Sequence, residues 1–125
     1  MKLRLHKNSL RLRLSQSEVA QFSKTGYVEE TVEFGPGASL CFVLETSSKA
    51  LGPNVRYQNG DLRIQVSSAQ GRDWATSDAV GISGEMVLSN GKQLAILIEK
   101  DFKCLHGEEP DPDAFPNPLE VDTRR

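Results

Sequence analysis

The sequence predicts an α+β domain of mostly antiparallel strands and two short helices, with an internal ββαββ duplication and pseudo-two-fold symmetry. Apolar and charged residues alternate in two separate stretches, which is the pattern of half-buried strands. A serine that can cap a helix follows each of these stretches. Sliding the chain so that Leu3 falls on Val55 also places Leu10 on Leu62. These three observations together favour two copies of one supersecondary unit.

The first half begins with alternating leucines and arginines at 3–5 and 10–14, which predict a β-hairpin with a turn at 7–9. Ser15 and Glu18 have the spacing of a capping box, so a short helix should start there and end at Gly26. Strands are predicted at 27–34 and 39–45, joined by a Gly-Pro-Gly turn. The unbroken apolar run in the second of these strands predicts burial on both faces.

The second half follows the same plan. Strands at 55–57 and 62–66 flank Asn59-Gly60, the strongest short signal for a hairpin turn. Ser67 opens a second capping box, and the helix that follows contains Trp74. Further strands are predicted at 80–88 and 94–99.

The alignment of the halves also places Phe22 on Trp74 and Val28 on Val80. A two-residue insertion then brings Glu45 onto Glu99. Any two alternating hairpins align passably, so chance similarity is the alternative. We predict one domain over residues 1–104, with repeats at 1–46 and 53–100.

Residues 105–125 form an acidic, proline-rich C-terminal tail in this prediction. Residues 105–122 hold six acids and no Lys or Arg, while residues 1–104 hold thirteen basic and eleven acidic groups. We expect Phe115 and Leu119 to dock the tail as a strap. The tail could lie near the basic face and compete with an anionic partner; a free, solubilising tail is the alternative.

Composition excludes some classes of protein. The 125 residues carry a formal net charge of −2, which argues against a strongly basic nucleic-acid binder. The longest apolar runs are far too short to cross a membrane, and no secretory signal is present. Two cysteines do not make a disulfide framework. We therefore expect a soluble, cytoplasmic protein with reduced thiols and no membrane partner.

Arginines provide the candidate binding residues. Alternation places Arg4, Arg11 and Arg13 on the face opposite the leucines. The duplication makes Arg56 and Arg63 the equivalents of Arg4 and Arg11. Guanidinium groups suit phosphate or carboxylate, so these five residues are the predicted anion-binding face. The alternative is a solvated strand face whose charges pair with Glu29 and Glu33.

Cys104 and His106 are the candidate site of the second hypothesis, a small enzyme with a cysteine nucleophile. With Glu108 and Asp111 they could also suggest a metal site, but their spacing matches no zinc pattern. Walker, Gly-x-Gly-x-x-Gly and Gly-x-Ser-x-Gly motifs are missing from the sequence. We expect no metal and no cofactor.

Several segments resemble a family of short bacterial proteins with no established activity. The Asp-Phe-Lys-Cys-Leu and Asp-Ala-Phe-Pro-Asn-Pro stretches, at 101–105 and 113–118, are the most distinctive of them. The resemblance also covers 1–4, 8–19, 28–37 and 99–105. It implies a bacterial, cytoplasmic source and carries no function.

Each half is also similar to the swapped-hairpin unit of AbrB-type transition-state regulators, which implies DNA binding through a basic face. The proline usual after their first strand is missing at Leu14-Ser15, and their Gly-Asp is missing at Gly26-Tyr27. We therefore favour a small non-catalytic binding or interaction module whose partner is a protein or an anionic ligand. Nucleic acid is a disfavoured partner, and pairing of exposed sheet edges in a larger complex is a third possibility.

Overall fold

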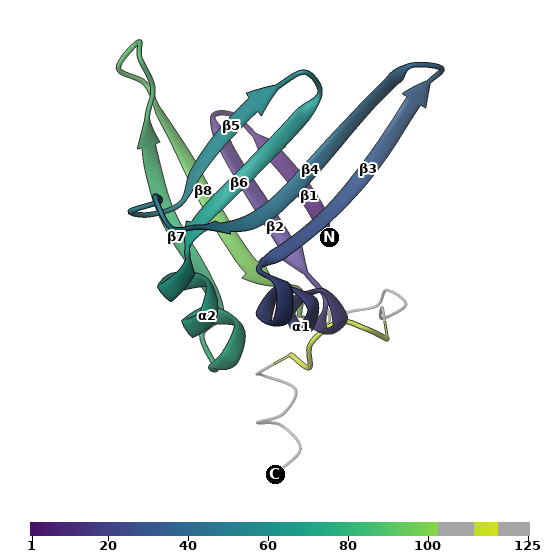
Figure 1. The fold of residues 1–125 in the computed structure, drawn as a ribbon, viewed down its shortest axis with the longest axis vertical. Coiled ribbons are helices and arrows are strands. Elements are labelled where there is room, and N and C mark those ends of the chain that lie inside the picture. Colours follow the sequence, from purple (N-terminus) through teal and green to yellow (C-terminus); the bar gives the residue numbers. More distant parts are fainter. Residues whose placement is uncertain (103–111, 118–125) are drawn as a thin grey trace.

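The computed structural model describes residues 1–102 and 112–117, and its α+β architecture confirms the predicted fold class (Figure 1). Eight strands and two helices follow one another along the chain. They are β1 (Lys2–His6), β2 (Ser9–Leu14), α1 (Gln16–Thr25), β3 (Tyr27–Gly35), β4 (Ala38–Ser47), β5 (Asn54–Gln58), β6 (Asp61–Ser67), α2 (Ser68–Thr76), β7 (Gly81–Val87) and β8 (Gln93–Lys100).

The strands form two four-stranded sheets, and each sheet takes one hairpin from each half of the chain. Sheet A has the order β1-β2-β8-β7, and sheet B has the order β3-β4-β6-β5. The hairpins pair antiparallel internally, whereas the two central ladders, β2 with β8 and β4 with β6, are parallel. Each half of the chain therefore contributes to both sheets.

The ladders keep the same register in the two halves. Arg4 pairs with Arg11 in sheet A, and Arg56 pairs with Arg63 in sheet B. Exchanging the halves maps β1-β2-β8-β7 onto β5-β6-β4-β3, which is sheet B read from its other edge. This pattern of pairing is what an internal duplication with pseudo-two-fold symmetry would produce.

One position of the sequence alignment was wrong. Val28 lies opposite Leu44, and its equivalent opposite Ile98 is Ile82 rather than Val80. Val28 and Ile82 are buried, whereas Val80 is half exposed. The two extra residues of the second half therefore lie before β7, in the segment that follows α2.

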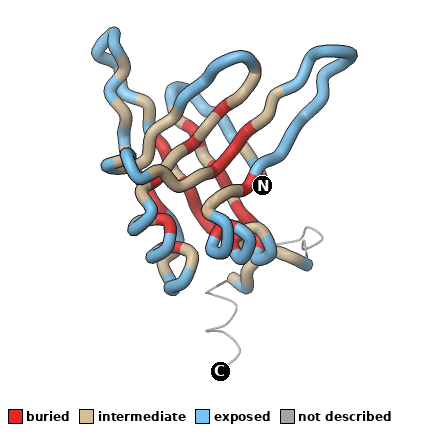
Figure 2. Tube along the Cα trace, viewed as in Figure 1, coloured by how far each residue is buried: buried red, intermediate tan, exposed pale blue. Residues whose placement is uncertain are grey.

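The core lies between the inner faces of the sheets and continues under the helices (Figure 2). Both helices lie at the same end of the sheets (Figure 1). The rings of Phe22 and Trp74 meet edge to face there, with centroids 5.9 Å apart. The indole of Trp74 donates a 3.1 Å hydrogen bond to the carbonyl of Val80. Both rings are buried, so they anchor the two helices to the core.

Local signals act as predicted at the helix ends and hairpin turns. The carboxylate of Glu18 accepts the backbone N–H of Ser15 at 2.9 Å, and Ser67 caps α2 through the amide of Gln70. Gly26 ends α1 with a φ of 71°. In the β5–β6 turn, Asn59 and Gly60 have φ values of 52° and 80°, as a type I′ hairpin requires.

Residues 112–117 dock against the start of α1 and the end of β8. The backbone amide of Gln16 donates to the carbonyl of Asp113, and the amide of Phe115 donates to the carbonyl of Asp101. The Phe115 ring packs against Phe102 and the core. This part of the predicted tail lies on α1 rather than on the arginines of β2. Leu119 and most of the predicted acidic residues lie outside the described residues.

Candidate anion-binding groove

The outer face of sheet A, opposite the core, gathers most of the predicted basic residues. Arg11 and Arg13 alternate on β2 with the buried leucines, so they point away from the core. The antiparallel register places Arg4 beside Arg11, Lys2 beside Arg13 and His6 beside Ser9. Four cationic side chains and one histidine thus share the face formed by β1 and β2.

Glu99 organises the centre of this face. Its Oε1 lies 2.7 Å from the Nε of Arg11 and 2.7 Å from the Nε of Arg13. Glu99 is only 9% exposed, whereas the side chains of Arg11 and Arg13 are 35% and 42% exposed, so solvent reaches the cationic side of both ion pairs. Lys2 pairs with Asp101 at 2.7 Å. Arg4 forms no ion pair with any residue that the structure describes.

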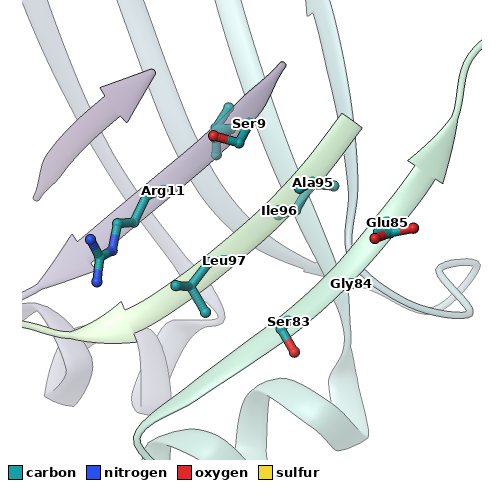
Figure 3. A pocket seen from close by; sticks show the side chains of 9 residues that line it. Ser9, Arg11, Ser83, Gly84, Glu85, Ala95, Ile96 and Leu97 are labelled. Carbon is teal, nitrogen blue, oxygen red and sulfur yellow. The ribbon is translucent and has the colours of Figure 1, made fainter. Parts of the chain in front are cut away.

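A shallow groove of about 590 Å³ crosses the face from β2 over β8 to β7 (Figure 3). Ala95 and Leu97 of β8 lie along its middle, between Arg11 on one side and Ser83 and Glu85 on the other. A second hollow of about 280 Å³ shares Ser9 and Arg11 with the groove and extends to Arg4 and His6. The two hollows give one continuous surface with a basic end and an apolar middle.

Sheet B carries the equivalent arginines in different surroundings. Arg56 and Arg63 lie side by side on its outer face, and Arg63 binds Glu45, the equivalent of Glu99, at 3.0 Å. Register and alternation place Glu29, Glu33 and Asp61 on the same face. The predicted set of five arginines is therefore divided between two faces, a basic one on sheet A and an acidic one on sheet B.

On the outer face of sheet B, side chains cover the positions that are equivalent to the groove of sheet A; we call this the closed face. The hydroxyl of Tyr27 donates to Glu29 at 2.7 Å, and the thiol of Cys41 lies 3.8 Å from the same carboxylate. The bond with Glu29 is the main reason why the pKa of Tyr27 rises to about 12. Val43 lies beside these groups and is only 1% exposed. Its equivalent Leu97 lies in the groove instead.

Sequence reasoning found the arginines but missed the residues that shape their surroundings. The partners of the arginines are Glu99 and Glu45, rather than the suggested Glu29 and Glu33. The alignment of Glu45 with Glu99 was the one available signal for this. Ala95, Leu97 and Ser83 had no signal of their own, because a groove depends on which strands are neighbours.

Cys104 and His106, the residues of the enzyme hypothesis, lie outside the described residues. Among residues 1–102 and 112–117, no three His, Cys, Asp or Glu side chains are grouped closely enough to hold a metal ion. In this part of the chain, neither helix is long and apolar enough to cross a bilayer. Among the described residues, Cys41 is not part of a disulfide bond.

The fold and the groove define a class: a duplicated ββαββ domain whose hairpins are shared between two sheets, with a basic outer face on one of them. Within this class the chain belongs to a family of unknown function, DUF7009, whose model matches residues 1–119. This match agrees with the resemblance to a short family without an assigned activity. No curated protein and no solved structure matches the chain. The likeness to the AbrB-type unit and the bacterial source stay predictions.

Proposed function

We propose that this protein is a small non-catalytic binding module that holds an anionic ligand at Arg4 and Arg11 on the outer face of sheet A. The observation that carries the proposal is the direct pairing of these two arginines across the β1–β2 ladder, beside a hollow that both line. Like charges placed directly opposite each other destabilise a strand pair. An anion between the two guanidinium groups would remove that repulsion and accept hydrogen bonds from both.

The distribution of acids supports sheet A as the binding face. Glu99 already forms ion pairs with Arg11 and Arg13, whereas Arg4 forms none with the described residues and is available for a ligand. On sheet B, Glu29, Glu33, Glu45 and Asp61 share the face with Arg56 and Arg63. An approaching anion would be repelled there, so the ligand should prefer sheet A.

Titration with inorganic phosphate and with acetate, followed by amide chemical shifts, tests the proposal. We expect a roughly millimolar dissociation constant, with shifts centred on β1 and β2 and weaker binding at high salt. Arg4→Gln should weaken binding about tenfold, because a hydrogen bond between charged groups is lost. Arg56→Gln is the matched control on sheet B and should leave the affinity unchanged.

Other results would contradict the proposal. Equal losses in Arg4→Gln and Arg56→Gln would mean that the anion follows overall charge rather than this site. Absence of binding by both anions would overturn the binding site itself. Loss of binding in Cys104→Ser, with Arg11→Glu unaffected, would favour the enzyme hypothesis instead.

A further inference from the structure

We infer that the ligand of the groove on sheet A is a carboxylate with a short apolar body and a far end that carries no negative charge. This inference rests on the function proposed above and assigns its ligand to a chemical class. It concerns the part of the surface beyond the arginines, from β8 to β7.

The middle of the groove is apolar. The ladders place Leu97 between Arg11 and Ser83, and Ala95 between Ser9 and Glu85. Ala95 is exposed and Leu97 is partly exposed. A volume of about 590 Å³ lies within the range of small-molecule sites, which are mostly apolar with a few polar groups. A ligand held by its anionic end at Arg11 would therefore lay its body over Ala95 and Leu97.

The equivalent surface of sheet B shows that this opening is not a property of the fold. The positions equivalent to Gly81, Ser83 and Ala95 are Tyr27, Glu29 and Cys41 on sheet B. Those three larger side chains interact with one another beside the buried Val43. The same backbone can thus carry a closed face, and the smaller side chains of sheet A leave the groove open.

Glu85, on the β7 side of the groove, limits the charge that the far end of the ligand can carry. Glu85 lies on β7, opposite Ala95, and lines the groove. No ion pair among the described residues occupies its carboxylate. A second negative charge at this end would be repelled, whereas a neutral or cationic group would be tolerated. Because strands lie about 4.8 Å apart, β2 and β7 are separated by roughly 10 Å, a span suited to a chain of about six carbons.

Four probes separate these features: acetate, hexanoate, 6-aminohexanoate and adipate, each titrated into the full chain and followed by amide chemical shifts. We expect hexanoate to bind about tenfold more tightly than acetate, since part of its methylene chain is buried. We expect 6-aminohexanoate to bind at least as tightly as hexanoate. Adipate has the same length and a second carboxylate, and it should bind at least about threefold more weakly than hexanoate.

Variants locate the apolar body. Ala95→Leu should fill the groove, so hexanoate should fall to the affinity of acetate while acetate itself is unaffected. Cys41→Leu makes the same change at the equivalent position of sheet B and should leave all four affinities unchanged. Ser83→Gln narrows the groove from β7 and provides a second filling variant if Ala95→Leu does not fold.

The possible outcomes separate the proposed anion site from the ligand class inferred here. If acetate binds at Arg4 and hexanoate binds no more tightly, the apolar body is wrong and the anion site stands. If adipate binds as tightly as hexanoate, the assigned far end is wrong. If hexanoate keeps its advantage in both filling variants, its chain lies elsewhere and the inference fails. If no probe binds, the proposed function fails as well.

Discussion

Glu99 shows how a single carboxylate limits the anion affinity of the basic face. It contacts Arg11 and Arg13 through one oxygen and competes with any incoming anion for both guanidinium groups. Its equivalent Glu45 is held by Arg63 and by the amide of Gln65. Arg13 on β2 and Gln65 on β6 occupy equivalent positions in the two halves. The charge of Arg13 is one of the differences that make the outer face of sheet A more basic than that of sheet B.

Removal of this carboxylate should strengthen ligand binding rather than weaken it. In Glu99→Gln, Arg11 is released for the ligand and the local field becomes more positive, so phosphate should bind about threefold to tenfold more tightly. Chemical-shift titration at low salt measures this effect. The variant Glu45→Gln on sheet B serves as the control, because its neighbours include other acids. Weaker phosphate binding by Glu99→Gln would show that Glu99 mainly positions Arg11 for the ligand.

Tyr27 reports on the closed face of sheet B. Its hydrogen bond to Glu29, followed by burial, raises the pKa of the phenol from 10.0 to about 12. The bond stabilises the folded state fully below pH 10.0, and this contribution is lost as the pH rises through about 12. In a Tyr57→Phe background, ultraviolet titration should show a single late phenolate. Glu29→Gln should return it towards 10.0, and an unchanged titration would contradict the assigned bond.

At the scale of elements, the two helices differ at two equivalent positions of their contact. A larger side chain at one position is compensated by a smaller one at the other. Trp74 occupies the position of Phe22, and Gly71 occupies the position of Val19. A Cβ atom at Gly71 would lie 3.0 Å from the Phe22 ring and 3.1 Å from Thr46. Gly71 therefore provides the space that lets the two aromatic rings meet.

Gly71→Val should lower the free energy of unfolding by about 1–3 kcal/mol, because the added methyl groups meet a filled core. Urea unfolding measures the change. Gly52→Val is the control, since no atom lies within 4 Å of a Cβ at that position. In the double variant Gly71→Val/Phe22→Leu, the loss of unfolding free energy should be smaller than the sum of the losses in the two single variants. Strict additivity would mean that the ring is not what Gly71 accommodates.

The elements themselves were predictable from sequence, since their signals are local. Ser15, Glu18 and Gly26 mark the ends of α1, and Asn59-Gly60 marks a hairpin turn. Which hairpins share a sheet was not predictable. The alternation of apolar and polar residues within a strand is the same whichever strand lies next to it. It therefore does not show that β2 pairs with β8 rather than with β4. The groove depends on that choice, so Ala95 and Ser83 could not be associated with Arg11 beforehand.

At the scale of the whole molecule, the exchange of hairpins makes the halves dependent on each other. Each sheet is completed by a parallel ladder between one half and the other. We expect residues 1–52 and residues 53–125, produced separately, to lack folded structure and to assemble when mixed. Circular dichroism and amide spectra of each fragment and of the mixture provide the measurement. A first fragment that folds alone would show that the exchange is not obligatory.

The parallel ladder between β2 and β8 has a consequence for how the protein is made. Arg13 and its partner Glu99 are 86 residues apart. At about 5–20 residues per second, a ribosome takes roughly 4–17 seconds to add that length. During this time the nascent β1–β2 hairpin exposes its leucines and an unpaired strand edge to solvent. Native folding must therefore wait for nearly the whole chain, and this hairpin is where chaperones or aggregation would act first.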